Sequence, residues 1–362
     1  MSGLIEVPDD WRALSARIDA EGGLAVLLGA SDSGKTTLAC WLVRTLTAAG
    51  RRVALVDGDI GQSTVGPPAT AGLAFAVPAQ IEPVFAPIAL RFVGAVSPAG
   101  QMLPLAAGLK RLAERASAMG AEVLLVDTTG FILGPSARRL KFHKIDLLAP
   151  HHLIALQRDD ELEPILRLFE GRKGMVISRL PVSPHVIPRS FQVRRSYRAQ
   201  RFVEYFRESS VVGISLHGVG VQGSWIYGGK PLDPAGLRGL SEELGAQVVW
   251  GERSQDEAFL LVQGAPSLHG LPLAKSRLGV SDVRVTATHE IRGLLLGLAD
   301  ADGELLALGL LQDLDLTSGR VLCLSPCAEP HRVGIVHFGS IRLDPSGEEL
   351  GDATNQSVEI HM

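Results

Sequence analysis

Residues 24–46 read LAVLLGASDSGKTTLACWLVRTL, and this stretch decides the fold. An apolar run at 24–28 is followed by GASDSGKT at 29–36, which fits the phosphate-binding pattern G-x-x-x-x-G-K-[ST], and then by a segment with helical patterning. This order suits the loop, because its backbone N–H groups and the N-terminus of the following helix face the same phosphate. The sequence therefore predicts a nucleotide-binding P-loop.

The loop also predicts how the nucleotide is held. Gly29 and Gly34 let the backbone wrap the phosphates, Lys35 reaches the β- and γ-phosphate oxygens, and Thr36 holds Mg²⁺. ATP and Mg²⁺ are the expected cofactors. The residues predicted to contact the nucleotide form one run: Gly29, Ala30, Ser31, Asp32, Ser33, Gly34, Lys35, Thr36 and Thr37.

The N-terminal half alternates between strand-like and helix-like segments. Apolar runs lie at 24–28, 53–56, 123–126, 153–156 and 175–177, and helical patterns lie at 36–49, 105–119 and 161–169. This alternation predicts a parallel sheet with helices on both faces. From about residue 211 onward, short alternating strands with Gly and Asp turns indicate a smaller β-rich domain. We expect a P-loop domain at 1–208 and a β-rich domain at 209–362.

Composition narrows the class of protein. The chain has 362 residues, of which 46% are hydrophobic and 20% charged, as in folded globular proteins. A net charge of −4 gives no general footprint for nucleic acid, so a basic binding surface has to be local. No apolar stretch approaches the length of a membrane span, and MSGLIEVPDD lacks a basic signal-peptide start. With three cysteines and no disulfide pattern, we expect a cytoplasmic protein.

A second acidic motif follows the next strand. Residues 57–62 read DGDIGQ, and their position after a strand places carboxylates at the carboxyl edge of the sheet, beside the phosphate loop. Phosphoryl transfer needs a carboxylate there to orient the acceptor hydroxyl or accept its proton, and the same group often joins the metal shell. We choose Asp59 for this catalytic and metal-binding role. Asp57 is the second choice.

Three motifs together resemble a known family, over about residues 22–208. GASDSGKTT, DGDIGQ and DTTGF at 127–131 are similar to motifs of the RNA 5′-hydroxyl kinases. That family includes the P-loop subunit of the mRNA cleavage-and-polyadenylation machinery, the kinase of ribosomal RNA processing and archaeal polynucleotide kinases. The resemblance implies transfer of the γ-phosphate of ATP to the 5′-hydroxyl of RNA or DNA, with the family's D-x-G-Q falling on Asp59 and Gln62. Its T-x-G-W clasp falls on Thr128, Thr129, Gly130 and Phe131, with Phe131 in place of Trp.

Residues 188–207 form a local basic segment, PRSFQVRRSYRAQRFVEYFR. Its arginines at 194, 198 and 201 share one helix face, a pattern that fits either stabilisation of phosphoryl charge or attachment to a nucleic-acid backbone. The resemblance implies a kinase lid of spacing R-x4-R-x3-R, which falls on Arg189, Arg194 and Arg198 as catalytic residues. Arg195 and Arg201 are predicted to contact the substrate, as are Asp57, Asp59, Gln62 and the clasp residues.

Other functions remain open at this point. DTTG at 127–130 also fits the D-x-x-G of a regulatory GTPase or ATPase, although the chain's single Asn, Asn355, lies far from the P-loop region and supplies no guanine-binding string. VDGD at 56–59 is also similar to adenylylsulfate kinases, which need neither a further β domain nor a long arginine lid. A kinase-like scaffold without catalysis is the remaining alternative, and the presence of Lys35, Thr36 and Asp59 favours activity over it.

Overall fold

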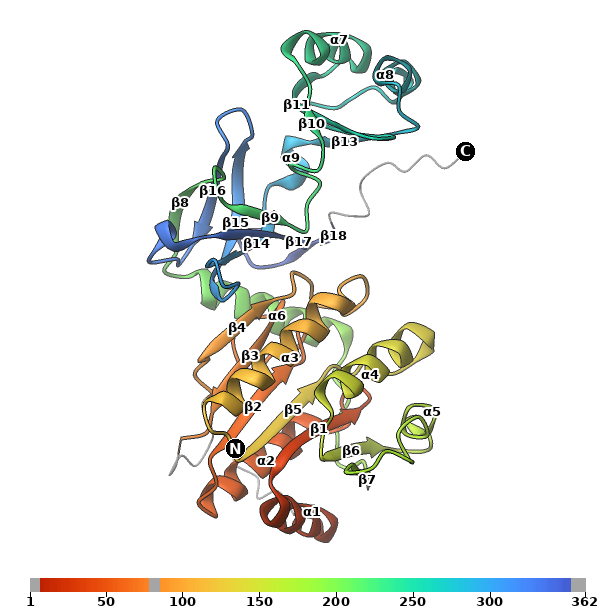
Figure 1. Cartoon of the computed structure of the whole chain (residues 1–362), viewed down its shortest axis with the longest axis vertical. Coiled ribbons are helices and arrows are strands. Elements are labelled where there is room, and N and C mark those ends of the chain that lie inside the picture. The colour runs from red at the N-terminus through yellow and green to blue at the C-terminus, as the bar shows by residue number, and fades with distance from the viewer. Residues whose placement is uncertain (1–6, 78–84, 353–362) are drawn as a thin grey trace. The chain divides into compact units, whose positions relative to one another are not determined.

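The computed structural model describes residues 7–77 and 85–352. The chain forms two compact units, Met1–Arg198 and Ala199–Met362, which are described separately here (Figure 1). The division falls within helix α6 (Phe191–Phe206), before the domain boundary suggested by the sequence at residue 208. That boundary stays a prediction.

The first unit is built on one seven-stranded sheet of order β4-β3-β2-β5-β1-β6-β7. The parallel strands are five: β2, β5, β1, β6 and β7. At one edge, β3 runs antiparallel to both β2 and β4. The strands are β1 (Gly23–Gly29), β2 (Val53–Gly58), β3 (Thr70–Phe75), β4 (Ala89–Phe92), β5 (Val123–Thr128), β6 (His152–Gln157) and β7 (Val176–Pro181).

Helices cover both faces of this sheet, as the sequence predicts. The helices are α1 (Asp9–Glu21), α2 (Lys35–Ala48), α3 (Met102–Ala118), α4 (Gly134–Leu148) and α5 (Glu163–Leu166), followed by α6. Side chains of α1 and α2 pack in one core layer, and those of α3, α4 and α5 pack in the other. Figure 1 shows α3 and α4 side by side over their face.

Strand β1 explains why both faces need cover. Alternate side chains of a strand point to opposite faces, so Val26 and Leu28 enter the layer of α3 and α4, while Ala25 and Leu27 enter the layer of α1 and α2. All four are fully buried. An apolar run without alternation therefore specifies a central strand of a parallel sheet.

The register of the central strands sets the position of the site. Asp57 of β2 lies opposite Asp127 of β5, and Gly58 lies opposite Thr128. Val26 of β1 lies opposite Val126. Because these strands are parallel, the phosphate loop, the DGDIGQ segment and the DTTGF segment all leave the sheet at the same carboxyl edge.

The second unit is β-rich, which confirms the expected fold class. One sheet has order β18-β17-β14-β15-β16-β8, with β9 paired to β17, and another has order β10-β11-β12-β13. Its strands are β8 (Ser210–Ser215), β9 (Gly220–Gln222), β10 (Lys230–Pro231), β11 (Gln247–Ser254), β12 (Glu257–Gln263), β13 (Asp282–Ala287), β14 (Leu294–Ala299), β15 (Leu305–Asp315), β16 (Arg320–Ser325), β17 (Ile335–Leu343) and β18 (Glu349–Asp352).

Some elements were not predicted from the sequence. The smaller sheet of the second unit packs with α7 (Pro234–Leu244) and α8 (Leu271–Leu278), and its β12 and β13 are parallel. A further short helix, α9 (Thr288–Ile291), follows β13, and single 3-10 turns lie at Leu268–Gly270 and Pro330–Arg332. In the first unit, α1 and α4 were missed, and the helix expected at 161–169 contains only the single turn of α5. Within the described ranges, no helix combines the length and apolar character needed to cross a membrane.

Candidate active site

The phosphate loop joins β1 to α2 with the backbone that its sequence predicts. Gly34 has φ +87°, a left-handed conformation that costs a glycine little, and Asp32 has φ +54°. Lys35 opens α2 with 5% of its side chain exposed, and its ammonium donates a hydrogen bond to the Ala30 carbonyl at 2.7 Å. The lysine thus folds back over the loop, as a residue directed at bound phosphate must.

Two side-chain hydrogen bonds tie the end of β5 to the residues on either side of this loop. The hydroxyl of Thr36 donates to Asp127 Oδ2 at 2.6 Å, and the hydroxyl of Thr128 donates to the Leu27 carbonyl of β1 at 2.7 Å. Gly130, in the segment predicted as a clasp, lies so close to the phosphate loop that a Cβ there would overlap the backbone and side chain of Ser31. The clasp and the loop are therefore in direct contact.

The DGDIGQ segment places its two carboxylates in different surroundings. Asp57 is 2% exposed, and its carboxylate accepts hydrogen bonds from the backbone N–H groups of Asp59, Thr64 and Val65 and from the Ser63 hydroxyl. Burial, and next the charge of Asp127, raise the pKa of Asp57 to about 7. Asp57 therefore organises the loop that follows β2.

Asp59 is only partly buried, and its Oδ1 accepts the backbone N–H groups of Gly61 and Gln62. Between the two carboxylates, Asp59 is thus the more accessible. Asp127 lies beside Asp57 and is 3% exposed, and burial raises its pKa, which the nearby Lys35 and the Thr36 hydroxyl partly oppose. Three carboxylates consequently gather at one end of β2 and β5.

The lid segment contacts both loops. The guanidinium of Arg194 lies 3.0 Å from Asp32 Oδ2, and the same oxygen accepts the backbone N–H of Arg189 at 3.1 Å. Arg189 also donates from Nη1 to Gln62 Oε1 at 3.0 Å. These contacts bring the start of α6 to the phosphate loop and to the DGDIGQ loop.

The other lid residues are placed along the same helix. Tyr197 of α6 donates from its hydroxyl to the Ser63 carbonyl at 3.1 Å. Arg198 is 7% exposed, so this predicted catalytic arginine is a buried one. Arg195 is partly buried, and Arg201 belongs to the second unit, where its guanidinium lies 3.7 Å from the Glu204 carboxylate.

Two residues that the sequence analysis missed lie against this site. Lys141 and Lys144, on α4, are 0% and 1% exposed. Lys141 donates to Thr128 Oγ1 at 2.8 Å and to the Thr129 carbonyl at 2.6 Å. A lysine in a helix is expected to face solvent, so the sequence carries no signal for this burial.

Several buried polar atoms at the site lack a hydrogen-bond partner within the described part of the chain. They include Ser33 Oγ in the phosphate loop, Thr129 Oγ1 in the clasp and Lys144 Nζ. Such atoms cost free energy, and hydroxyls at a phosphate loop and its clasp suit oxygens of a bound nucleotide. The residues present therefore fit a nucleotide.

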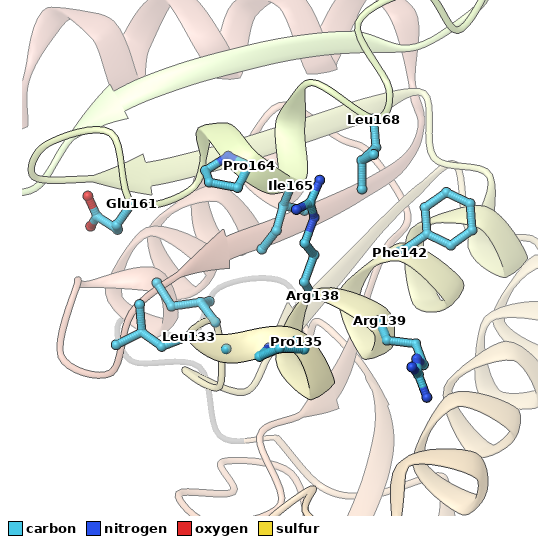
Figure 2. Close-up of a pocket in the computed structure, with 11 residues that line it drawn as sticks. Leu133, Pro135, Arg138, Arg139, Phe142, Glu161, Pro164, Ile165 and Leu168 are labelled. Carbon is cyan, nitrogen blue, oxygen red and sulfur yellow. The ribbon is translucent and has the colours of Figure 1, made fainter.

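A groove of about 640 Å³ lies next to the clasp (Figure 2). Ile132 and Leu133, which directly follow the clasp, line it together with Arg138 of α4 and Ile165 of α5. None of the predicted site residues lines this groove. The candidate active site is therefore the sheet edge beside it, where the hydrogen-bonded loops meet.

The fold and the site define a P-loop nucleotide-binding protein. Residues 29–208 match the family described as mRNA cleavage and polyadenylation factor CLP1 P-loop. A polyribonucleotide 5′-hydroxyl-kinase of Pyrococcus horikoshii is 32% identical over 350 residues, which cover 96% of this chain and 93% of that protein. One of Methanocaldococcus jannaschii is 31% identical over 359 residues, covering 98% and 96%. The chain belongs to the CLP1 P-loop family, together with these archaeal polyribonucleotide 5′-hydroxyl-kinases.

One solved structure, at low sequence identity, supports the fold alone. A complex of Clp1p with Pcf11p superposes with a TM-score of 0.57 at 12% identity, over 92% of this chain and 79% of that one. The fold class predicted from the sequence is thereby confirmed. The family resemblance is confirmed by the family match and by the archaeal relatives.

The contact between Gly130 and Ser31 gives a prediction. Gly130→Ala forces the clasp away from the phosphate loop, so the KM for the nucleotide should rise at least ~5-fold, and the free energy of unfolding should fall by about 1–3 kcal/mol. Steady-state kinetics and urea denaturation measure both. Gly171→Ala is the control, because a Cβ there meets open space and its φ is not left-handed. Equal behaviour of the two variants would show that the close approach is unimportant.

Proposed function

We propose that this protein transfers the γ-phosphate of ATP to the 5′-hydroxyl end of an RNA strand, with DNA as a further acceptor. The main support for this proposal is that lid residues form hydrogen bonds with both loops. Arg194 contacts Asp32 of the phosphate loop, and Arg189 contacts Gln62 of the DGDIGQ loop. Membership of a family with polyribonucleotide 5′-hydroxyl-kinases supports the same reaction.

The nucleotide is held by the phosphate loop. Backbone N–H groups of residues 30–37 and the N-terminus of α2 face its phosphates, and Lys35 neutralises charge at the β- and γ-phosphoryl oxygens. Ser33 Oγ and Thr129 Oγ1 then gain the partners that they lack among the described residues. The clasp residue Gly130 leaves room for the loop to approach β5 closely.

Mg²⁺ fits this donor set. Mg²⁺ in nucleotide sites binds one or two protein oxygens together with substrate phosphates, so it does not need a cage of protein ligands. No group of three or more His, Cys, Asp or Glu side chains suited to a metal occurs in the described ranges. We assign the Thr36 hydroxyl and the Asp59 carboxylate to the ion, with Asp127 behind Thr36. When bound, the ion neutralises charge on the phosphoryl oxygens.

Asp59 also serves the acceptor. Its carboxylate orients the 5′-hydroxyl and accepts its proton while the 5′-oxygen bonds to the γ-phosphorus and the bond to ADP breaks. The lid arginines Arg189, Arg194 and Arg198 stabilise the charge on the transferred group. We keep Gln62, Arg195, Arg201 and the clasp residues Thr128, Thr129 and Phe131 as contacts to the acceptor strand.

The reaction is tested by label transfer. With Mg²⁺ and γ-labelled ATP, a 5′-hydroxyl RNA should gain the label, while the same RNA bearing a 5′-phosphate should not. A DNA oligonucleotide of matched sequence measures the preference between acceptors. Hydrolysis of ATP or GTP without labelling of either strand would support a regulatory NTPase instead.

We expect amide substitution of the two carboxylates in DGDIGQ to affect different quantities, kcat for Asp59 and the free energy of unfolding for Asp57. Asp59→Asn should lower kcat at least ~10²-fold with nucleotide affinity retained, because it removes the proton-accepting oxygen. Asp57→Asn should lower the free energy of unfolding by about 1–3 kcal/mol, because its amide would face backbone N–H donors. Kinetics and denaturation on both variants separate the roles. Full turnover in Asp59→Asn would refute the assignment.

A further inference from the structure

Helix α4 carries two lysines in the interior of the first unit. Lys141 and Lys144 are spaced three residues apart and so share one face of the helix. Their side chains are 0% and 1% exposed. Lysine is almost never fully buried unless paired, because the ammonium loses its hydration. Two such residues behind a candidate active site call for a function.

The two lysines differ in what they touch. Lys141 Nζ donates to Thr128 Oγ1 and to the Thr129 carbonyl, and the Thr128 hydroxyl in turn donates to the Leu27 carbonyl of β1. A chain of hydrogen bonds therefore runs from α4 through the clasp to the central strand. The Thr129 carbonyl belongs to the peptide group that leads into Gly130, whose backbone abuts Ser31 of the phosphate loop.

Lys144 has no such link. Its nitrogen has no hydrogen-bond partner within the described residues, and the carboxylates of Asp59 and Asp127 act on it through their charge. Burial lowers the pKa of Lys144 to about 8, so it stays mainly charged at neutral pH. Burial, and next the charge of Lys144, lower the pKa of Lys141 well below its usual value. Lys144 thus provides a matched buried lysine without a clasp contact.

We propose that Lys141 is a positioning residue for phosphoryl transfer: its hydrogen bonds to Thr128 and Thr129 hold the clasp against the phosphate loop. This inference rests on the proposed function for its catalytic consequence, but not for the clasp geometry itself. Phosphoryl transfer depends on the placement of the reacting groups, and a misplacement of about 1 Å can cost ~10²-fold in rate. The Lys141 nitrogen reaches both oxygens at once because a lysine nitrogen carries more than one N–H donor.

Three variants test the proposal. Lys141→Met removes the N–H donors with similar volume, and Lys141→Gln keeps an N–H donor. Lys144→Met removes a buried lysine three residues away that has no clasp contact. Hydrogen exchange of the peptide covering residues 127–133 reports clasp mobility without any need for activity. Turnover and KM are measured per folded enzyme, with the thermal midpoint recorded for each variant.

We expect Lys141→Met to raise amide exchange across the clasp, to lower kcat at least ~10-fold, and to raise the KM for ATP in the same direction as Gly130→Ala does. Lys141→Gln should show a smaller rise in clasp exchange and a smaller fall in kcat than Lys141→Met. Lys144→Met should leave clasp exchange at the parent level.

The proposal falls if Lys141→Met leaves clasp exchange unchanged, if Lys144→Met raises it equally, or if exchange rises while kcat stays at the parent value. Failure of the proposed function looks different. In that case the parent protein itself does not label RNA, while the exchange measurement still reports whether Lys141 holds the clasp.

Discussion

The hydrogen bond between Thr36 and Asp127 is the contact on which the site depends. It joins the first turn of α2 to the end of β5, with 2.6 Å between the two oxygens. Three residues after Asp127, Gly130 makes a second contact with the phosphate loop, at Ser31. Because β5 is also in parallel register with β2, this junction places the phosphate loop beside the DGDIGQ segment. The lid then closes the arrangement through Asp32.

Charge shapes the site as much as geometry does. Asp57 and Asp127 are almost fully buried at the ends of neighbouring strands, and burial is the largest cause that raises the pKa of each. The charge of Asp127 raises the pKa of Asp57 further. The buried lysines Lys35, Lys141 and Lys144 lie in the same region. The charge of Lys35 lowers the pKa of Asp127, and the charges of Asp59 and Asp127 raise the pKa of Lys144. Removing one member of such a set usually leaves an uncompensated charge. The pattern explains why polar residues fill the interior at this edge of the sheet.

Much of this fold is readable from local patterns. The apolar runs of β1, β2, β5 and β6 and the glycine loop specify a central parallel sheet, since each pattern reports its own backbone and burial. Helix α4 was missed because its buried face carries Lys141 and Lys144, which break the apolar periodicity expected of a helix that packs on a sheet. The different environments of Asp57 and Asp59 were equally hidden, since they depend on the fold of residues 61–65 rather than on residue type.

The central claim is that the lid and the DGDIGQ carboxylate act on one transferred phosphoryl group, and a double-mutant cycle on kcat tests it most directly. Arg194→Ala and Asp59→Asn are each expected to lower kcat at least ~10²-fold at saturating ATP and RNA. Residues that act on one transition state are non-additive, so the account predicts that the double variant is at most ~10-fold slower than the slower single variant. Independent losses that multiply to ~10⁴-fold or more would contradict it.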